Sequence, residues 1–148
     1  MKKINLIIIG IVFVASVVFI SVFGMKIMIY NGIVPVTKVE CLNQSDGKSI
    51  VSEDEYGKLI EVEFTTPGNA ETQTGTMLQL TYRVYPDNAT KKKVKYVYNR
   101  ELTRVKMVTD ESGNELGLFL FSGKCYFKVQ IMATDGSGIC DTVTIWVK

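Results

Sequence analysis

Apolar and polar side chains alternate along several short runs in the C-terminal part of the chain. The runs cover residues 59–64, 76–86, 93–98, 104–109, 116–121, 125–133 and 142–147, and turn-forming segments such as residues 110–114 and 134–138 separate them. Alternation with a period of two predicts strands that bury one face. Short strands that follow one another at intervals of about 8–12 residues are typical of an antiparallel sandwich. We therefore predict an all-β domain over residues 59–148.

The parity of each run predicts which side chains form the core. In the longest run, Phe127, Val129, Ile131 and Ala133 share one side. Burial of a large apolar side chain stabilises a fold by about 1.5–3 kcal/mol. Trp146, in contrast, has outward parity. The same reasoning predicts further inward residues: Leu78, Leu80, Tyr82, Val84, Val94, Tyr96, Tyr98, Val143, Ile145 and Val147.

A long apolar segment opens the chain. Between residues 4 and 25 the polar side chains are Asn5, Ser16 and Ser21. A helix over residues 6–25 would span about 30 Å, which is the thickness of the hydrocarbon core of a bilayer. We therefore predict that residues 1–26 form a signal-anchor, a single transmembrane helix that contacts the lipid bilayer through residues 4–25.

Lysines on the two sides of this segment predict its orientation. Lys2 and Lys3 precede it and Lys26 follows it, and an excess of positive residues marks the cytoplasmic side. The N-terminus is therefore expected in the cytoplasm and the C-terminal domain outside the cell. The alternative is a secretory signal that is cleaved after Gly24, which would release the domain into the medium.

Three segments of the C-terminal part share their pattern with a known family. LTYRVYPDNATKKKVKY (80–96) is a strand that ends in Pro86, an Asn-Ala-Thr turn and a Lys/Val/aromatic strand. DESGNELG (110–117) contains a glycine-bearing turn, and FKVQIMATDGSGICDTVTIWV (127–147) is a strand, an Asp-Gly turn and a final strand. On these motifs, residues 59–148 resemble a bacterial immunoglobulin-like domain of group 2. The chain differs at Tyr96, where the family usually has tryptophan.

The resemblance implies an immunoglobulin-like antiparallel β-sandwich. Domains of this family occur in bacterial surface proteins, including adhesins of the intimin and invasin type, and they serve as spacers, stalks and binding modules. A second difference lies at SGKCYFKV (122–129), where the family usually has a small Gly-Thr-Ala-like step. The resemblance implies a non-catalytic role without a cofactor, and it carries over no functional residue.

Residues 27–58 connect the apolar segment to the predicted sandwich. Val34, Val36, Val39 and Ile50 make this segment too apolar for a disordered linker. We expect a membrane-proximal strand or hairpin that docks on the sandwich, with the acidic residues 52–58 in a loop.

A group of basic residues is the candidate binding site. The net charge of +2 provides no general attraction to nucleic acid, although residues 82–106 are basic and residues 36–75 are acidic. For a domain outside the cell, the expected ligand is an anionic wall polymer or a phospholipid headgroup, and no nucleic acid is expected. The alternative is a solvated turn. The group comprises Lys91, Lys92, Lys93, Lys95, Arg100 and Arg104.

The chain contains no histidine, so the commonest general base and a leading zinc ligand are absent from it. We expect no catalytic residue, no cofactor and no metal site. Glu53 and Glu55 could act as an acid–base pair and residues 110–114 and 134–138 could bind calcium, but an acidic loop and two turns explain them better. Cys41 and Cys125 could form a disulfide, or all three cysteines could be free thiols.

These features predict a membrane-anchored extracytoplasmic module for binding, adhesion or structural display at the cell surface, and not an enzyme. Surface glycans, anionic wall polymers and protein receptors are the expected partners. The alternatives are an accessory or pilin-like subunit of a membrane assembly and, third, a surface hydrolase.

Overall fold

The computed structural model of the chain describes residues 32–55 and 57–148. The transmembrane helix predicted for residues 1–26 lies outside these residues. Within the described part, no helix is long and apolar enough to cross a membrane. Residues Pro35–Lys148 form one compact unit, and its regular elements are all strands, which confirms the all-β prediction.

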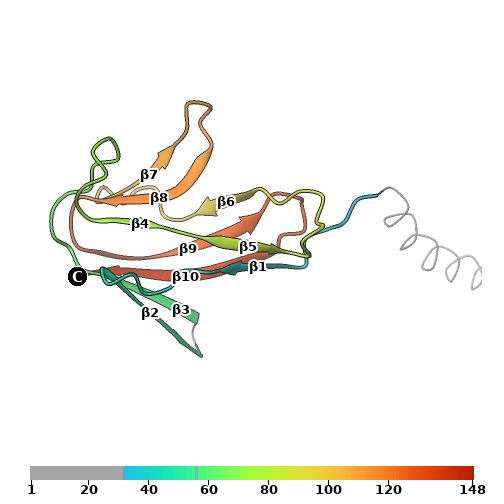
Figure 1. Cartoon of the computed structure of the whole chain (residues 1–148), viewed down its shortest axis with the longest axis horizontal. Coiled ribbons are helices and arrows are strands. Elements are labelled where there is room, and N and C mark those ends of the chain that lie inside the picture. The colour runs from blue at the N-terminus through green and yellow to red at the C-terminus, as the bar shows by residue number, and fades with distance from the viewer. Residues whose placement is uncertain (1–31, 56) are drawn as a thin grey trace, which may run out of the picture. The chain divides into compact units, whose positions relative to one another are not determined.

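The described residues form ten strands (Figure 1). In chain order they are β1 (Lys38–Cys41), β2 (Ser49–Asp54), β3 (Gly57–Val62), β4 (Met77–Gln79), β5 (Tyr82–Tyr85), β6 (Val94–Val97), β7 (Val105–Thr109), β8 (Glu115–Phe121), β9 (Cys125–Ala133) and β10 (Cys140–Val147). The turn predicted for residues 110–114 is confirmed, because Asp110 Oδ1 accepts hydrogen bonds from the amides of Ser112 and Asn114.

The strands pair into three sheets, with the orders β2-β3-β10-β9-β6, β4-β8-β7 and β1-β5. The last two meet along one run of chain, since only Leu80 and Thr81 separate β4 from β5. The Leu80 amide donates to Gly117 O on β8 and the Leu42 amide, next to β1, donates to Thr81 O, each at 2.9 Å. The strand order β1-β5/β4-β8-β7 therefore continues across the break.

One strand pair departs from the antiparallel prediction. β3 and β10 are parallel, in a register that sets Val143 against Lys58 and Val147 against Val62. No hairpin joins these two strands, which lie far apart in the sequence, so no short turn forces them to run in opposite directions. The prediction of a purely antiparallel sandwich is wrong at this pair.

Side chains from the different sheets share one core. The rings of Phe119 on β8 and Phe127 on β9 have centroids 6.0 Å apart, and Tyr98 lies within 5.4 Å of Phe119 and 6.2 Å of Phe127. Rings at these separations contribute beyond the area that they bury. The inward parity predicted for β9 and β10 is confirmed, since Phe127, Val129, Ile131, Ala133, Val143, Ile145 and Val147 are all buried.

One predicted inward residue, Tyr82, is not buried, and neither is Ile50 of the apolar segment before the sandwich. Tyr82 is 36% exposed because it lies where the pairing partner of the β4/β5 run changes from β8 to β1. Its ring contacts the Tyr96 ring edge-on. Ile50 is 60% exposed because it lies on the outward face of β2, opposite Glu61 of β3. The remaining members of the predicted set, apart from the half-buried Tyr98, are buried: Leu78, Leu80, Val84, Val94 and Tyr96.

The segment before β3 belongs to the sheets. Val36 and Val39 are buried in the core, and β1 pairs with β5. The prediction that residues 52–58 form a loop is wrong for most of them. Residues 52–54 form the end of β2, and Gly57 and Lys58 form the start of β3. The two strands make a tight hairpin that is closed by the pair Asp54 and Gly57.

Candidate functional site

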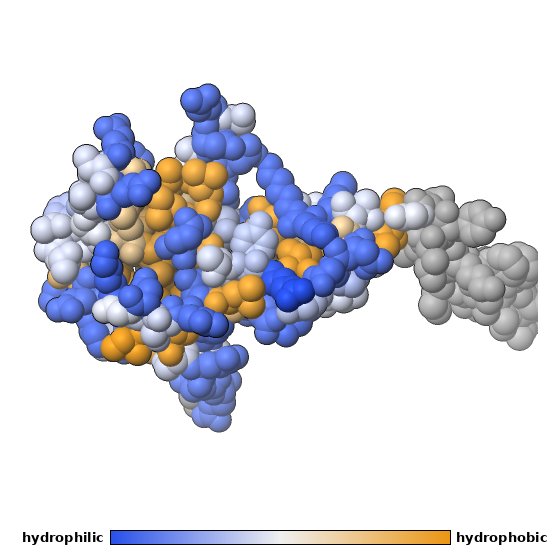
Figure 2. Space-filling model, viewed as in Figure 1, coloured by the Kyte–Doolittle hydropathy of each residue, from blue (hydrophilic) through white to orange (hydrophobic). Residues whose placement is uncertain are grey.

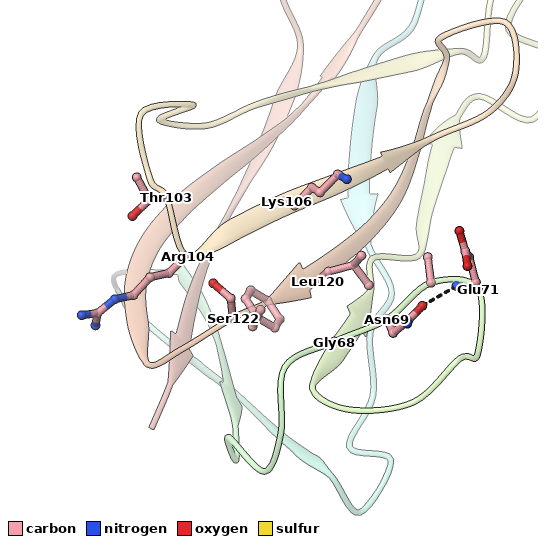
Figure 3. Close-up of a pocket in the computed structure, with 10 residues that line it drawn as sticks. Gly68, Asn69, Glu71, Thr103, Arg104, Lys106, Leu120 and Ser122 are labelled. Atoms are coloured by element: carbon pink, nitrogen blue, oxygen red, sulfur yellow. Dashed lines mark hydrogen bonds between the residues drawn. The ribbon is translucent and has the colours of Figure 1, made fainter.

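A hollow of about 450 Å³ lies at one end of the β4-β8-β7 sheet (Figure 3). Asn69 Oδ1 accepts a hydrogen bond from the Glu71 amide at 2.9 Å within its wall. Arg104 points away from it in the figure and donates to Lys124 O at 3.0 Å. Glu71 is the single carboxylate of the described lining, so the hollow does not present the carboxylate pair of a glycosidase.

Arg104 has surroundings different from those of the other predicted basic residues. Lys91, Lys92 and Lys95 are exposed in and beside the β5–β6 connection. Lys93 Nζ donates to Asn114 Oδ1 and Arg100 Nη2 pairs with Glu115 Oε1, so these two side chains lie together against the β7–β8 hairpin. Arg104, as noted above, is held at the turn that follows β8.

The lysine-bearing connection lies at the end of the compact unit where the chain enters it. The Val36 amide donates to Asp135 Oδ2 at 2.7 Å, and Thr134 donates to Lys93 O from its amide and its hydroxyl. The Ser137 hydroxyl and the Val36 amide lower the pKa of Asp135 to about 2. Three segments, residues 35–37, 91–95 and 134–139, therefore meet at this end (Figure 1).

The outer face of the five-stranded sheet carries a feature that sequence reasoning missed. In one cross-strand row, Tyr126 of β9 lies opposite Trp146 of β10, Trp146 lies beside Glu61 of β3, and Glu61 lies opposite Ile50 of β2. The exposed fractions of Tyr126, Trp146 and Ile50 are 63%, 41% and 60%. We call these four residues the outer row.

Charged and polar groups surround the outer row. Lys148 Nζ lies 5.3 Å from the centroid of the Trp146 ring and 2.5 Å from Glu61 Oε2. A hollow of about 580 Å³ beside the row is lined by Ile50, Glu61 and Lys124 among others. A second hollow, of about 330 Å³, is lined by Lys124 and Tyr126 among others, so Lys124 borders both.

Parity alone could have found part of this row. It places Trp146 outward, and Tyr126 precedes the inward Phe127. The sequence does not state which outward residue of one strand lies beside which residue of the next, because that depends on the pairing register.

The face of the molecule shown in Figure 2 is mainly hydrophilic, with apolar residues in separate patches.

The thiols of the described residues are free, and no disulfide joins Cys41 to Cys125. Cys41 is buried, and its Sγ donates to Asn43 Oδ1 at 3.3 Å. Burial raises the pKa of the Cys41 and Cys125 thiols. Among the described residues, no group of three or more cysteine, aspartate or glutamate side chains is placed to hold a metal ion.

Neither a comparison with protein-family models nor a comparison with curated proteins gives a match. The resemblance to bacterial immunoglobulin-like domains of group 2 therefore stays a prediction that rests on the residues quoted for it.

Proposed function

We propose that the chain is a membrane-anchored extracytoplasmic immunoglobulin-like domain that serves binding, adhesion or structural display at the cell surface. Residues 1–26 anchor it as a single-pass helix with the N-terminus in the cytoplasm. The domain over residues 59–148, with the preceding segment 27–58, projects outside the cell.

The strand order is the observation that carries this proposal. Immunoglobulin-like domains place strands A, B, E and D in one sheet and C, F and G in the other. With the β2–β3 hairpin set aside, the remaining elements take the letters A to G in chain order, counting β4 and β5 as one strand. They then form the orders β1-β5/β4-β8-β7 and β6-β9-β10, which correspond to A-B-E-D and C-F-G.

The sites described above support a binding role over catalysis. The hollow beside β4-β8-β7 has one carboxylate in its described lining, whereas the outer face of the five-stranded sheet exposes large aromatic side chains. Exposed aromatic groups with polar neighbours mark interaction surfaces. Surface glycans, anionic wall polymers and protein receptors are the proposed partners.

Topology in intact bacteria tests the proposal. The full chain, with an epitope tag after Lys148, is expressed in bacterial cells, and protease is added to the intact cells or to spheroplasts where an outer membrane is present. We expect the tag in the membrane fraction, its loss on protease treatment and an intact mass that begins at residue 1. A tag that resists protease until the cells are lysed would overturn the proposal.

The mass of the purified protein separates anchoring from secretion. A mature chain that begins after Gly24 and is found in the medium or periplasm would contradict the anchor while leaving the exported domain in place. Co-purification of the intact chain within a large stoichiometric membrane complex would favour the accessory-subunit alternative instead.

A further inference from the structure

We propose that the outer row, centred on Trp146 and Tyr126, is a binding platform for an extended polysaccharide of β-1,4-linked pyranose units. This inference names a ligand class for the displayed domain, and in that sense it rests on the function proposed above. It assigns the contact to the outer face of β9 and β10 and not to the basic residues of the β5–β6 connection.

The row has the dimensions of such a chain. Tyr126, Trp146, Glu61 and Ile50 occupy neighbouring positions on four adjacent strands. Adjacent strands lie about 4.8 Å apart, so the row extends roughly 14 Å across the sheet. This spacing is close to the length of one pyranose unit, and an extended chain laid across the strands would place successive units over successive side chains.

The chemistry of the row matches the two sides of a sugar. A pyranose ring has a C–H face that packs on aromatic rings, and hydroxyl groups at its rim that donate and accept hydrogen bonds. Tyr126 and Trp146 provide the rings. Glu61 provides acceptors, while Lys148 and Lys124 provide donors at its border. Lys148 already lies over one side of the Trp146 ring, so a stacked sugar uses the other side or displaces the ammonium group.

The charge and area of the row argue for this occupant over a protein. Glu61 is paired with Lys148, and the hollow beside the row has Lys48, Lys124 and Lys148 against Glu61 and Glu63, so a single excess positive charge offers little attraction to an anionic polymer. A stable protein interface buries about 800 Å² on each partner. A fully buried aromatic side chain contributes roughly 150–250 Å², so two partly exposed rings and Ile50 fall well short of that area. One polysaccharide chain needs much less.

The single tryptophan of the chain provides a direct measurement. Trp146 is the only tryptophan, so the intrinsic fluorescence of the purified full chain in detergent micelles reports on the proposed platform. Chitohexaose and cellohexaose are titrated separately, with the α-linked maltohexaose for comparison. We expect a saturable change in fluorescence with at least one of the β-linked probes and none with the α-linked probe.

Variants decide which residues bind. Tyr126→Ala is expected to weaken binding at least tenfold by the same titration, and Trp146→Ala to abolish retention on insoluble chitin or cellulose. Val97→Ala is the matched control, because Val97 is 42% exposed on β6 of the same sheet but lies outside the row, opposite Gln130. If Trp146→Ala does not fold, as judged by circular dichroism, Trp146→Phe, which keeps a ring, and Tyr126→Ala carry the test.

Three outcomes would overturn the inference. The first is no binding to either β-linked probe, and the second is binding that is the same in Tyr126→Ala and in Val97→Ala. The third is dimerisation at micromolar concentration that Trp146→Ala removes, which would assign the row to a second copy of the chain. Because these measurements use purified protein, their failure leaves the topology experiment on cells unaffected.

Discussion

The two faces of the β9–β10 pair are built from alternate residues of the same two strands and have opposite surroundings. On the inner face Val129, Ile131 and Ile145 are each 0% exposed. On the outer face Tyr126 and Trp146 are 63% and 41% exposed. The inner residues determine stability because each loses its full contact with water, whereas Tyr126 keeps most of its contact with water and contributes little to stability. The outer face is therefore where a large aromatic side chain can serve a ligand without cost to the fold.

The largest expected difference in stability is between a variant that loses an aromatic ring on the inner face and one that loses a ring on the outer face. Phe127→Ala should destabilise the domain by about 3–5 kcal/mol, because its ring packs on Phe119, Phe121 and Tyr98. The neighbouring Tyr126→Ala should change the stability by no more than about 0.5 kcal/mol. Urea unfolding followed by circular dichroism measures both. Equal losses in the two variants would contradict the separation of the faces.

The second-largest loss of stability is expected from a substitution at a glycine next to the core. Gly117 has φ of +71°, and a Cβ at this position would lie 2.2 Å from the Tyr96 hydroxyl oxygen. Gly117→Ala should therefore cost about 2–4 kcal/mol, from the left-handed backbone and from overpacking.

Gly113→Ala is the control for this substitution. Gly113 has a similar φ of +78° but no atom within 4 Å of the added Cβ, so it should cost only the backbone share of about 1 kcal/mol. Urea unfolding of the two variants under the same conditions separates steric overlap from backbone strain. Matching losses would show that the Tyr96 ring moves aside freely.

A pH dependence is expected from the end where the chain enters the domain. The pKa of Asp135 is lowered to about 2 by the Ser137 hydroxyl and the Val36 amide. A carboxyl with a lowered folded-state pKa stabilises the fold above its unfolded value near 4, and this contribution is lost as the pH falls toward 2. The stability of the wild type should therefore decline over this window, and Asp135→Asn should decline less. Parallel curves for the two proteins in acid unfolding would refute the assignment.

The smallest perturbation is chemical labelling, which leaves the fold unchanged. Cys140 is exposed and Cys41 is buried, and burial raises the pKa of the Cys41 thiol. A maleimide reagent should label Cys140 first in the native protein and reach Cys41 only after unfolding, as peptide mass spectrometry would show. Rapid native labelling of Cys41 would mean that the β1–β5 pair opens readily.

Much of the β-sheet could be predicted because burial acts residue by residue. The inward sets of β9 and β10 and the turn at residues 110–114 follow from local pattern alone. Tyr82 has the same inward parity as Leu80 and Val84, yet it is exposed because the partner strand changes beside it. The acidic residues 52–54 read as a loop, but hydrogen bonding to β3 makes them strand.

The candidate basic site shows the same limit. Lys93 and Arg100 find partners on the β7–β8 hairpin, while Arg104 is held elsewhere. Closeness in the sequence did not show that Arg104 would have separate surroundings, because the hydrogen bond of Arg104 to Lys124 O depends on the tertiary structure.

The sequence by itself determined the β character of the domain, the inward and outward side of most strands and the prediction of an apolar anchor. These depend on hydrophobicity and its period, which are local properties of the chain. Only the tertiary structure decided the parallel β3–β10 pair, the free state of Cys41 and Cys125, and the alignment of Tyr126, Trp146, Glu61 and Ile50 in one row. The parallel pair and the outer row depend on which strands become neighbours and in which register, and many registers satisfy the same alternation.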